Sequence, residues 1–338
     1  MADVKKAKAA KKPKLANAAE ISIDPGTREL QARAQTMGID TIFDRAAQMK
    51  PCNIGIQGIC CKNCAMGPCR LPLPKGGIEG KDMRKGLCGA TANTIAARNF
   101  ARMVAAGAAA HSDHGRCVAE VFMSAARKET DAYKIKDVNK LLSIAPHFGV
   151  DITVEVDGEV QDRDVDEIAL EVAEKALNEW GKAEGELDYL KRAPAPLYEK
   201  WTKNGVKPRN IDREIVEIMH RTHMGVDQDY KNITKQCTRA SLADGWGGSM
   251  LATDLQDVLF GTPFPLQAEA NLGVMKEDHV NIIVHGHEPV LSEMIVAMSQ
   301  KPELIEYAKS KGAKGIQLGG ICCTANEIFQ RHGVPQAG

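Results

Sequence analysis

Residues 52–69 read CNIGIQGICCKNCAMGPC, which places five cysteines in a segment that is rich in glycine and has no helical or strand periodicity. A sixth thiol, Cys88, follows soon after. The N-terminal residues lack the apolar core of a secretory signal, so we expect a cytoplasmic protein whose thiols stay reduced. In that compartment, clustered cysteines bind metal more often than they form disulfides.

The adjacent pair Cys60 and Cys61 divides these thiols into two sets. Neighbouring side chains of an extended segment point to opposite sides, so we expect the two thiols to serve different sites. Four of the six form one compact set along the chain: Cys61, Cys64, Cys69 and Cys88. Cys52 and Cys60 remain as half a site, which a two-fold axis between two chains would complete. The count therefore predicts one site per chain and one site shared across a homodimer.

The spacing of the thiols bears on the kind of site. Iron–sulfur clusters and structural zinc both use about four protein ligands. Zinc loops usually carry two C-x2-C pairs, whereas this segment has one such pair, irregular spacings and apolar neighbours such as Ile54, Ile59 and Met66. The pattern favours 4Fe–4S clusters, with a zinc site and unligated thiols as the alternatives.

Composition and periodicity divide the chain into three parts. The 338 residues carry 44 basic and 44 acidic side chains with few aromatics, and we expect neither a nucleic-acid partner nor a membrane span. Residues 1–20 predict a disordered Lys/Ala-rich tail, and residues 21–268 a mostly helical domain. Within it we expect two short helices split at Gly38, one or two long, buried Ala-rich helices in 86–128, and amphipathic helices in 162–180 and 211–225.

The pattern changes after residue 268. The apolar run Val280–Val284 is typical of a buried parallel strand, and residues 313–323 predict a second strand. A helical pattern follows each strand, and this order predicts the start of a Rossmann-like α/β domain over residues 269–338. The expected fold class is mixed α and α/β, with a helical domain carrying Fe–S clusters before a parallel α/β unit.

Potential ligands follow both predicted strands. The motif His285-Gly-His287 ends the first strand, and Cys322 and Cys323 end the second. Because loops converge at the carboxyl ends of parallel strands, we expect a histidine and a cysteine to meet there. Imidazole with thiolate suits iron, nickel or zinc. The alternative is a cysteine pair that only packs.

The Ala-rich segment carries a further set of titratable groups. The sequence HSDHGRC places His111, His114 and Cys117 roughly along one helix face. Such groups are unfavourable on a buried helix without a purpose, and histidines can pass protons near neutral pH. The alternative is hydrogen-bonded core histidines. Two histidines are expected at the surface and one cysteine in a structural position: His220, His223 and Cys237.

Taken together, these residues resemble the anaerobic nickel–iron carbon monoxide dehydrogenases. The resemblance runs from about residue 25 to the end of the chain. Besides the Cys52–Cys88 pattern it rests on HSDHGR at 111–116, GWGGSMLATDLQDVLFGTP at 245–263, VHGHEPVLSEM at 284–294 and GGICCTANE at 319–327. It implies a homodimer that converts CO and water into CO2, two protons and two electrons. It also implies a ferredoxin-like electron acceptor and the option of an attached acetyl-CoA synthase.

The resemblance also assigns residues by position. Cys52 and Cys60 match the ligands of a cluster at the dimer axis, and the four-thiol set matches an in-chain 4Fe–4S cluster. His287 and Cys323 match two ligands of the Ni–Fe–S active cluster, and Cys322 matches a position adjacent to that cluster. His111 matches the acid/base near the active cluster, and His114 matches the next histidine of a proton path. In better-known relatives that path continues through histidines where this chain has Cys117 and Glu120.

The family takes further active-cluster cysteines, and a lysine near that cluster, from domains that would lie beyond Gly338. A chain that ended there is expected not to oxidise CO by itself. Two other functions are therefore kept open. One is an Fe–S electron-transfer fragment that holds only the first two clusters. The other is a reductase like the hybrid-cluster proteins, which share the fold.

Overall fold

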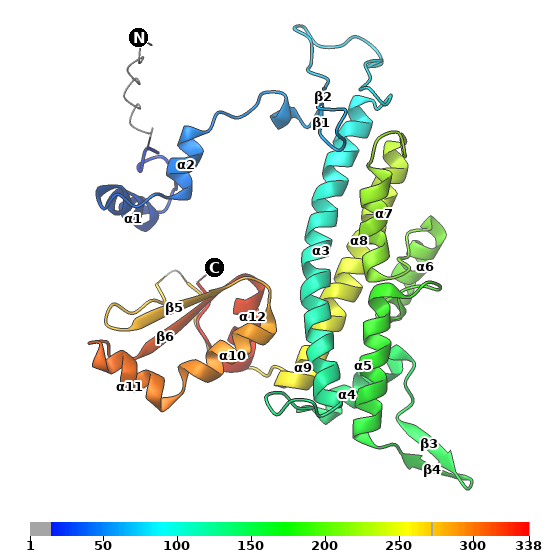
Figure 1. Ribbon diagram of the computed structural model, residues 1–338, viewed down its shortest axis with the longest axis vertical. Helices are drawn as coiled ribbons and strands as arrows, with labels where there is room; N and C mark the ends of the chain where they lie inside the picture. The colour runs from blue at the N-terminus through cyan, green and yellow to red at the C-terminus, as the bar shows by residue number, and fades with distance from the viewer. Residues whose placement is uncertain (1–14, 272, 338) are drawn as a thin grey trace, which may run out of the picture.

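The computed structural model describes residues 15–271 and 273–337 (Figure 1). Residues 1–14 of the predicted tail lie outside this part of the chain. Most of the described regular structure is helical, and a small parallel α/β unit follows it, as the sequence predicts. None of the helices in the described part is long and apolar enough to cross a membrane.

The helical domain contains nine of the α-helices in the described ranges. They are α1 (Pro25–Thr36), α2 (Ile42–Gln48), α3 (Ala92–Ala126), α4 (Val138–Ile144), α5 (Val165–Gly181), α6 (Ala195–Asn204), α7 (Ile211–Arg221), α8 (Tyr230–Ala243) and α9 (Met250–Phe260). The short turns are the 3-10 helices η1 (Gly55–Gln57), η2 (Ala145–Phe148) and η3 (Asp188–Arg192), and the π-helical turn η4 (Asp244–Ser249). Two antiparallel pairs are β1 (Cys60–Cys61) with β2 (Cys69–Arg70), and β3 (Thr153–Val156) with β4 (Glu159–Asp162).

Helix α3 runs unbroken for 35 residues through the helical domain. Thr91 caps it by accepting a hydrogen bond from the amide of Thr94, and its alanine-rich composition favours helix. One face packs against α5, α7, α8 and α9. Phe100 and Met103, on another face, are 54% and 75% exposed. The prediction of a buried segment is therefore correct for one face only, because neighbouring helices cover only part of its circumference.

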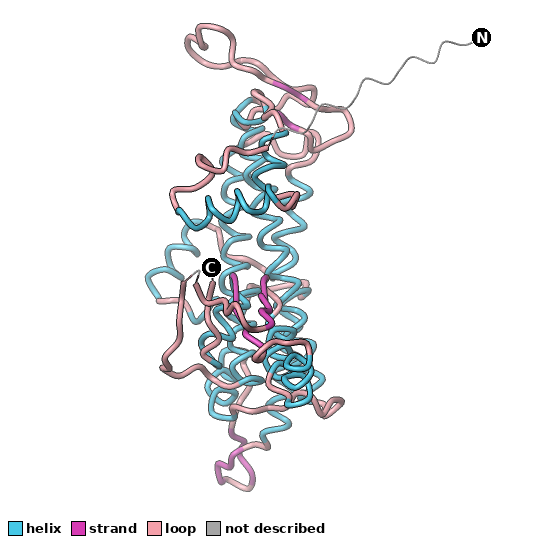
Figure 2. Tube along the Cα trace, turned by 90° about the vertical axis from the view of Figure 1, so that its left-hand side faces the viewer, coloured by secondary structure: helices cyan, strands magenta, loops and turns pink. Residues whose placement is uncertain are grey.

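The two ends of the helical domain carry different features. Figure 2 shows the loops around β1 and β2 at one end and the β3–β4 hairpin at the other. The hairpin was not predicted, since its strands are mostly polar; its turn has positive φ at Asp157 and Gly158. The predicted helix over 211–225 ends earlier, at Arg221, and Gly225 takes a φ of +71° in the turn that follows. The helix pair split at Gly38 is confirmed.

The α/β unit contains two parallel strands in the described part of the chain. It consists of β5 (Val280–His285), α10 (Pro289–Ser299), α11 (Pro302–Ser310), β6 (Ile316–Ile321) and α12 (Cys322–His332). The strands pair from Val280 opposite Ile316 to His285 opposite Ile321. The predicted burial of β5 is only partly correct: Ile283 remains 37% exposed, because each strand of a two-stranded sheet is an edge strand.

Arg331 holds the α/β unit against α9. Its side chain is only 3% exposed and donates to the carbonyl of Gly261 at 2.8 Å and to Asp257 Oδ1 at 2.6 Å. It also pairs with Glu327 on its own helix. Buried charge is tolerated when it is paired in this way. The contact holds the last turn of α12 against the end of α9.

Candidate metal centres

Four thiols line one small pocket at the β1–β2 end of the helical domain. They are Cys61, Cys64, Cys69 and Cys88, the set that the spacing groups together. Pairing of β1 with β2 places Cys61 opposite Cys69. Gly67 allows the intervening loop to close, since a Cβ there would lie 3.1 Å from the carbonyl oxygen of Cys61. The local fold therefore brings the four thiols to one place.

The surroundings of Cys88 favour its thiolate. Arg98 is buried beside it and donates to Cys88 Sγ at 3.5 Å and to the carbonyl of Asp227 at 2.7 Å. Burial raises the pKa of Cys88, but the Arg98 guanidinium, backbone amides and Gln228 outweigh it and bring the pKa down to about 7. A thiol with such a pKa is about half thiolate at neutral pH and so is ready to bind metal. Sequence reasoning missed Arg98, because nothing in its local pattern distinguishes it from a surface arginine.

Cys52 and Cys60 lie apart from this pocket. Neither lines it, although Cys60 is the immediate neighbour of Cys61 in β1. Cys52 is exposed just before η1, and hydrogen bonds from the amides of Gly55 and Ile54 lower its pKa. The nearby charges of Arg70 and Lys62 act in the same direction. The expected division of the six thiols into four and two is therefore present in the geometry.

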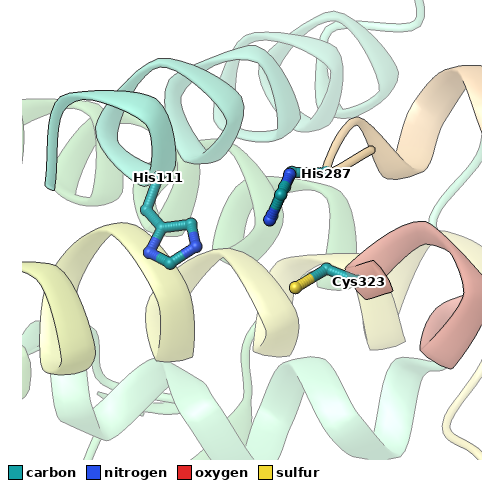
Figure 3. A group of neighbouring side chains, drawn as sticks. All are labelled: His111, His287 and Cys323. Carbon is teal, nitrogen blue, oxygen red and sulfur yellow. The ribbon is translucent and has the colours of Figure 1, made fainter. Parts of the chain in front are cut away.

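A second group of ligands meets between the helical domain and the α/β unit. Potential ligand atoms of His111, His287 and Cys323 all lie within 4.8 Å of one another (Figure 3). His111 comes from α3, His287 from the loop after β5, and Cys323 from the first turn of α12. The three side chains also line a common pocket. The expectation that a histidine and a cysteine meet at the strand ends is confirmed.

Two backbone features assemble this group. The amide of Thr324 donates to the carbonyl of Gly286 at 3.0 Å, which ties the His287 loop to the start of α12. On the other side, α3 and η4 touch backbone to backbone: a Cβ on Gly115 would lie 2.5 Å from the carbonyl oxygen of Gly248. The π-helical turn and these two glycines thus bring η4 directly beneath His111.

Asp244, in η4, fixes the ring of His111. Its Oδ1 lies 2.6 Å from His111 Nδ1, and Ser249 Oγ lies 3.4 Å from the same nitrogen. Because a carboxylate only accepts, Nδ1 carries the hydrogen and Nε2 remains available for other chemistry. Sequence reasoning missed Asp244 although it noted the adjacent GWGGSM segment, since the contact depends on the π turn.

The remaining predicted residues take different positions. His114 stacks on His287, with ring centroids 5.7 Å apart and planes 12° apart. Cys322 does not join the group of three; its Sγ lies 3.3 Å from His285 Nε2, and its φ is +66°.

Burial, together with Glu288, raises the pKa of Cys117 to about 11, so its thiol stays protonated near neutral pH. As expected, two histidines are exposed and one isolated thiol is buried: His220, His223 and Cys237.

A sequence model described as the Prismane/CO dehydrogenase family matches residues 59–338. The chain belongs to this family. It is 51% identical to carbon monoxide dehydrogenase 1 of Methanosarcina mazei over 94% of this chain and 49% of that protein. It is 40% identical to the carbon monoxide dehydrogenase/acetyl-CoA synthase subunit beta of Moorella thermoacetica, over 93% and 45% of the two chains.

Solved structures agree with this membership. The chain superimposes on a nickel-free carbon monoxide dehydrogenase from Thermococcus sp. AM4 with a TM-score of 0.84 and 50% identity. The match covers 95% of this chain and 49% of that one. The chain thus spans about half the length of the relatives that it matches.

The donor sets suit the clusters of a Prismane/CO dehydrogenase family member. Four thiols around one pocket match the ligand number of a 4Fe–4S cluster. At the second site, burial and then the imidazoles of His111, His114 and His285 lower the pKa of His287, which favours a neutral ring able to bind metal. Burial, Cys322 and Glu327 raise the pKa of Cys323, so its thiolate needs a cation beside it. His114 Nδ1 is buried without a hydrogen-bond partner among the described residues.

Replacement of Gly115 by alanine tests the close approach of α3 and η4. We expect Gly115→Ala to lower the free energy of unfolding by about 1–3 kcal/mol, because the added methyl would overlap the carbonyl of Gly248. Gly107→Ala in the same helix is the matched control. Its Cβ would meet nothing within 4 Å, so it should gain about 0.5–1 kcal/mol. Equal unfolding midpoints for the two variants in denaturant would contradict the contact.

Proposed function

We propose that the protein containing these residues is an anaerobic nickel–iron carbon monoxide dehydrogenase that catalyses CO + H2O ⇌ CO2 + 2 H⁺ + 2 e⁻. The observation that carries the proposal is the convergence of His111, His287 and Cys323 at one pocket, with a separate pocket of four thiols. Soft sulfur and imidazole ligands suit nickel and iron. The 40–51% identity to proteins named carbon monoxide dehydrogenases supports the same chemistry.

Each set of ligands has a role in this proposal. His287 and Cys323 hold part of a Ni–Fe–S active cluster, and the four-thiol pocket holds a 4Fe–4S cluster. Cys52 and Cys60 hold half of a further cluster, completed by the same residues of a second chain. When bound, the active cluster supplies a Lewis acid for water and CO together with an acceptor for electrons. Cys322 is adjacent to this site but is not one of the three converging ligands, since its thiol lies against His285.

Protons leave by way of the two histidines of α3. His111 takes a proton at Nε2 while Asp244 holds Nδ1 in place. His114 lies one turn further along α3 and stacks on His287, so it is the next carrier. Cys117 cannot extend this path, because its thiol, with a pKa of about 11, neither takes up nor releases a proton near neutral pH. Protons therefore pass from His114 toward solvent by another route.

The proposed protein works as a cytoplasmic homodimer. The pair Cys52 and Cys60 offers too few thiolates for a cluster in one chain, and Cys52 is exposed, which supports completion by a second copy. Electrons then leave to a ferredoxin-like acceptor. Association with an acetyl-CoA synthase is the remaining part of the proposal, supported by similarity to a subunit of the Moorella carbon monoxide dehydrogenase/acetyl-CoA synthase.

Metal content together with activity tests the function. We expect the full-length protein, purified without oxygen, to contain nickel, sulfide and roughly six or more irons per chain, and to reduce a viologen dye in the presence of CO. Iron and sulfide without nickel, and no CO-dependent reduction, would instead indicate an electron-transfer protein. Zinc without sulfide would refute the cluster assignment altogether.

Asp244 provides a separate test of the proton step. We expect Asp244→Ala to lower kcat for CO oxidation by about 10- to 100-fold with nickel and iron content unchanged, since His111 loses the group that fixes its tautomer. Asp244→Asn, which keeps a hydrogen-bonding side chain, should recover part of the rate. The control is Asp113→Asn, whose side chain on α3 is 82% exposed. Wild-type turnover by Asp244→Ala would remove the carboxylate from the mechanism.

A further inference from the structure

Arg98 is a buried cation that has no carboxylate partner. It lies on α3 and is 1% exposed. Its Nη2 donates to the carbonyl of Asp227 at 2.7 Å, while the carboxylate of Asp227 is taken by Arg221 at 2.9 Å. Within the described ranges Arg98 forms no ion pair, and its Nε is buried without a hydrogen-bond partner. A buried charge of this kind is unfavourable unless an anion lies beside it.

The four-thiol pocket is where that anion would lie. Arg98 lines the pocket, and its Nη1 donates to Cys88 Sγ at 3.5 Å. Apart from the four cysteines, the other described residues that line the pocket are uncharged: Asn63, Gly86, Leu87, Ala90, Ile95 and Met224. In the described part of the chain, therefore, no carboxylate and no second cation shares this pocket with Arg98.

Contacts from two segments hold Arg98 in place. Thr94, one turn earlier on α3, donates through Oγ1 to the carbonyl of Gln228 at 2.8 Å, and Gln228 Nε2 donates to the carbonyl of Cys88 at 2.8 Å. Together with the hydrogen bond from Arg98 to Asp227, these contacts tie the loop after α7 to α3 and to the edge of the pocket. The guanidinium therefore has a fixed position beside the thiols.

We infer that Arg98 supplies the counter-charge of the cluster in the four-thiol pocket and raises the reduction potential of that cluster. The inference rests on the proposed function and adds a residue that sets the energy of one electron-transfer step. An iron–sulfur cluster with four thiolates is anionic and gains a further negative charge on reduction. A fixed positive charge close to it, in a poorly solvated site, stabilises the reduced form more than the oxidised form.

Other donors to these sulfurs are neutral. The amide of Leu87 donates to Cys69 Sγ at 3.4 Å, and Gln228 Nε2 lies 3.8 Å from Cys88 Sγ. Such hydrogen bonds also raise the potential of a cluster, but each contributes only a dipole. Removal of Arg98 therefore takes away the full charge and leaves these neutral donors in place.

The electrons balance one at a time. In the proposed reaction, each CO oxidised with one water gives CO2, two protons and two electrons. The cluster takes one electron from the active centre and passes it on toward the ferredoxin-like acceptor before it takes the second; no bond forms or breaks in the pocket. A raised potential favours the transfer from the active centre to the cluster.

Arg98→Gln tests the inference in the full-length protein. Glutamine keeps a side-chain donor for the Asp227 carbonyl but removes the charge. The measurement is a redox titration of anaerobically purified protein without CO, followed by electron paramagnetic resonance. The signal of the in-chain cluster is the one that is missing from Cys64→Ser/Cys69→Ser. We expect the ratio of reduced to oxidised cluster at a given potential to fall about tenfold, which is a shift of about 59 mV to lower potential for one electron.

Two further variants separate charge from shape. Arg98→Lys keeps the positive charge, so most of the wild-type potential should return. Arg102→Gln is the matched control, because Arg102 lies one turn further along α3, donates to Thr222 Oγ1 at 2.6 Å and does not line the pocket. This control should keep the wild-type potential. Because Arg98 is buried, the difference between Arg98→Gln and the wild type should persist at about 0.5 M salt.

The outcomes separate this inference from the function that it rests on. An unchanged potential in Arg98→Gln would overturn the inference, as would an equal fall in Arg98→Lys, since shape rather than charge would then act. If Arg98→Gln loses the iron of this cluster, recovery of the iron and the wild-type potential by Arg98→Lys would support the counter-charge, and failure to recover them would refute it. A wild-type protein that holds this cluster without oxidising CO would overturn the proposed function alone. Absence of the cluster signal from the wild type would overturn both.

Discussion

Replacing His287 by alanine and Cys323 by serine is expected to abolish CO oxidation by the full-length protein, with a loss on the order of 10³-fold or more. Both side chains lie in the group of three and come from the ends of the two parallel strands, so their removal takes away the ligands that the α/β unit supplies. Nickel content should fall with activity. Most of the iron should remain, because the four-thiol pocket is separate.

A thiol elsewhere provides the control for this variant. Cys237 is buried in α8, and its Sγ donates to the carbonyl of Ile233 one turn back. Cys237→Ala should retain nickel, iron and CO oxidation, at a modest loss of stability. If the His287/Cys323 variant instead kept its nickel and its turnover, the group of three would not be the active centre.

Loss of Cys52 and Cys60 gives the second large expected effect. In Cys52→Ser/Cys60→Ser we expect the iron of one cluster to be lost for every two chains, because each chain contributes half of the proposed shared site. CO-dependent electron transfer to a protein acceptor should fall by about 100-fold or more, since electrons are proposed to leave the protein through that cluster. The measurements are iron and sulfide per dimer and the rate with ferredoxin.

The matched variant removes two thiols from the four-thiol pocket. Cys64→Ser/Cys69→Ser should lose one cluster for every chain, and so twice the iron lost from the first variant. The ratio between the two losses distinguishes a shared site from a site within one chain. Equal iron losses, or no loss from the first variant, would refute the shared cluster.

The arrangement of the second site was largely predictable from the sequence. A buried apolar run, a helix and another apolar run specify two parallel strands, and parallel strands end at one edge. His287 and Cys323 directly follow those strands, so their proximity depends on topology alone. The grouping of Cys61 with Cys64 and Cys69 was likewise predictable, because neighbours in a short loop stay close.

The supporting contacts were not predictable in the same way. Asp244 reaches His111 because a π turn and two glycines let η4 approach α3, and no local pattern encodes that contact. Arg98 and Arg331 are buried, although arginine usually faces solvent, because carbonyl and carboxylate partners meet them inside the fold. Cys322 shares its sequence environment with Cys323, yet a positive φ turns it toward His285.

The distribution of ligands along the chain sets an order for maturation. All four thiols of the first pocket lie between Cys61 and Cys88, so this set of ligands comes from one short stretch of the chain. The ligands of the second site come from three distant parts of the chain. Most of the chain separates His111 from Cys323, and the two lie together only in a fold that packs the α/β unit against α9. In the proposed enzyme, nickel would therefore enter later than the iron of the first pocket, once the α/β unit is in place.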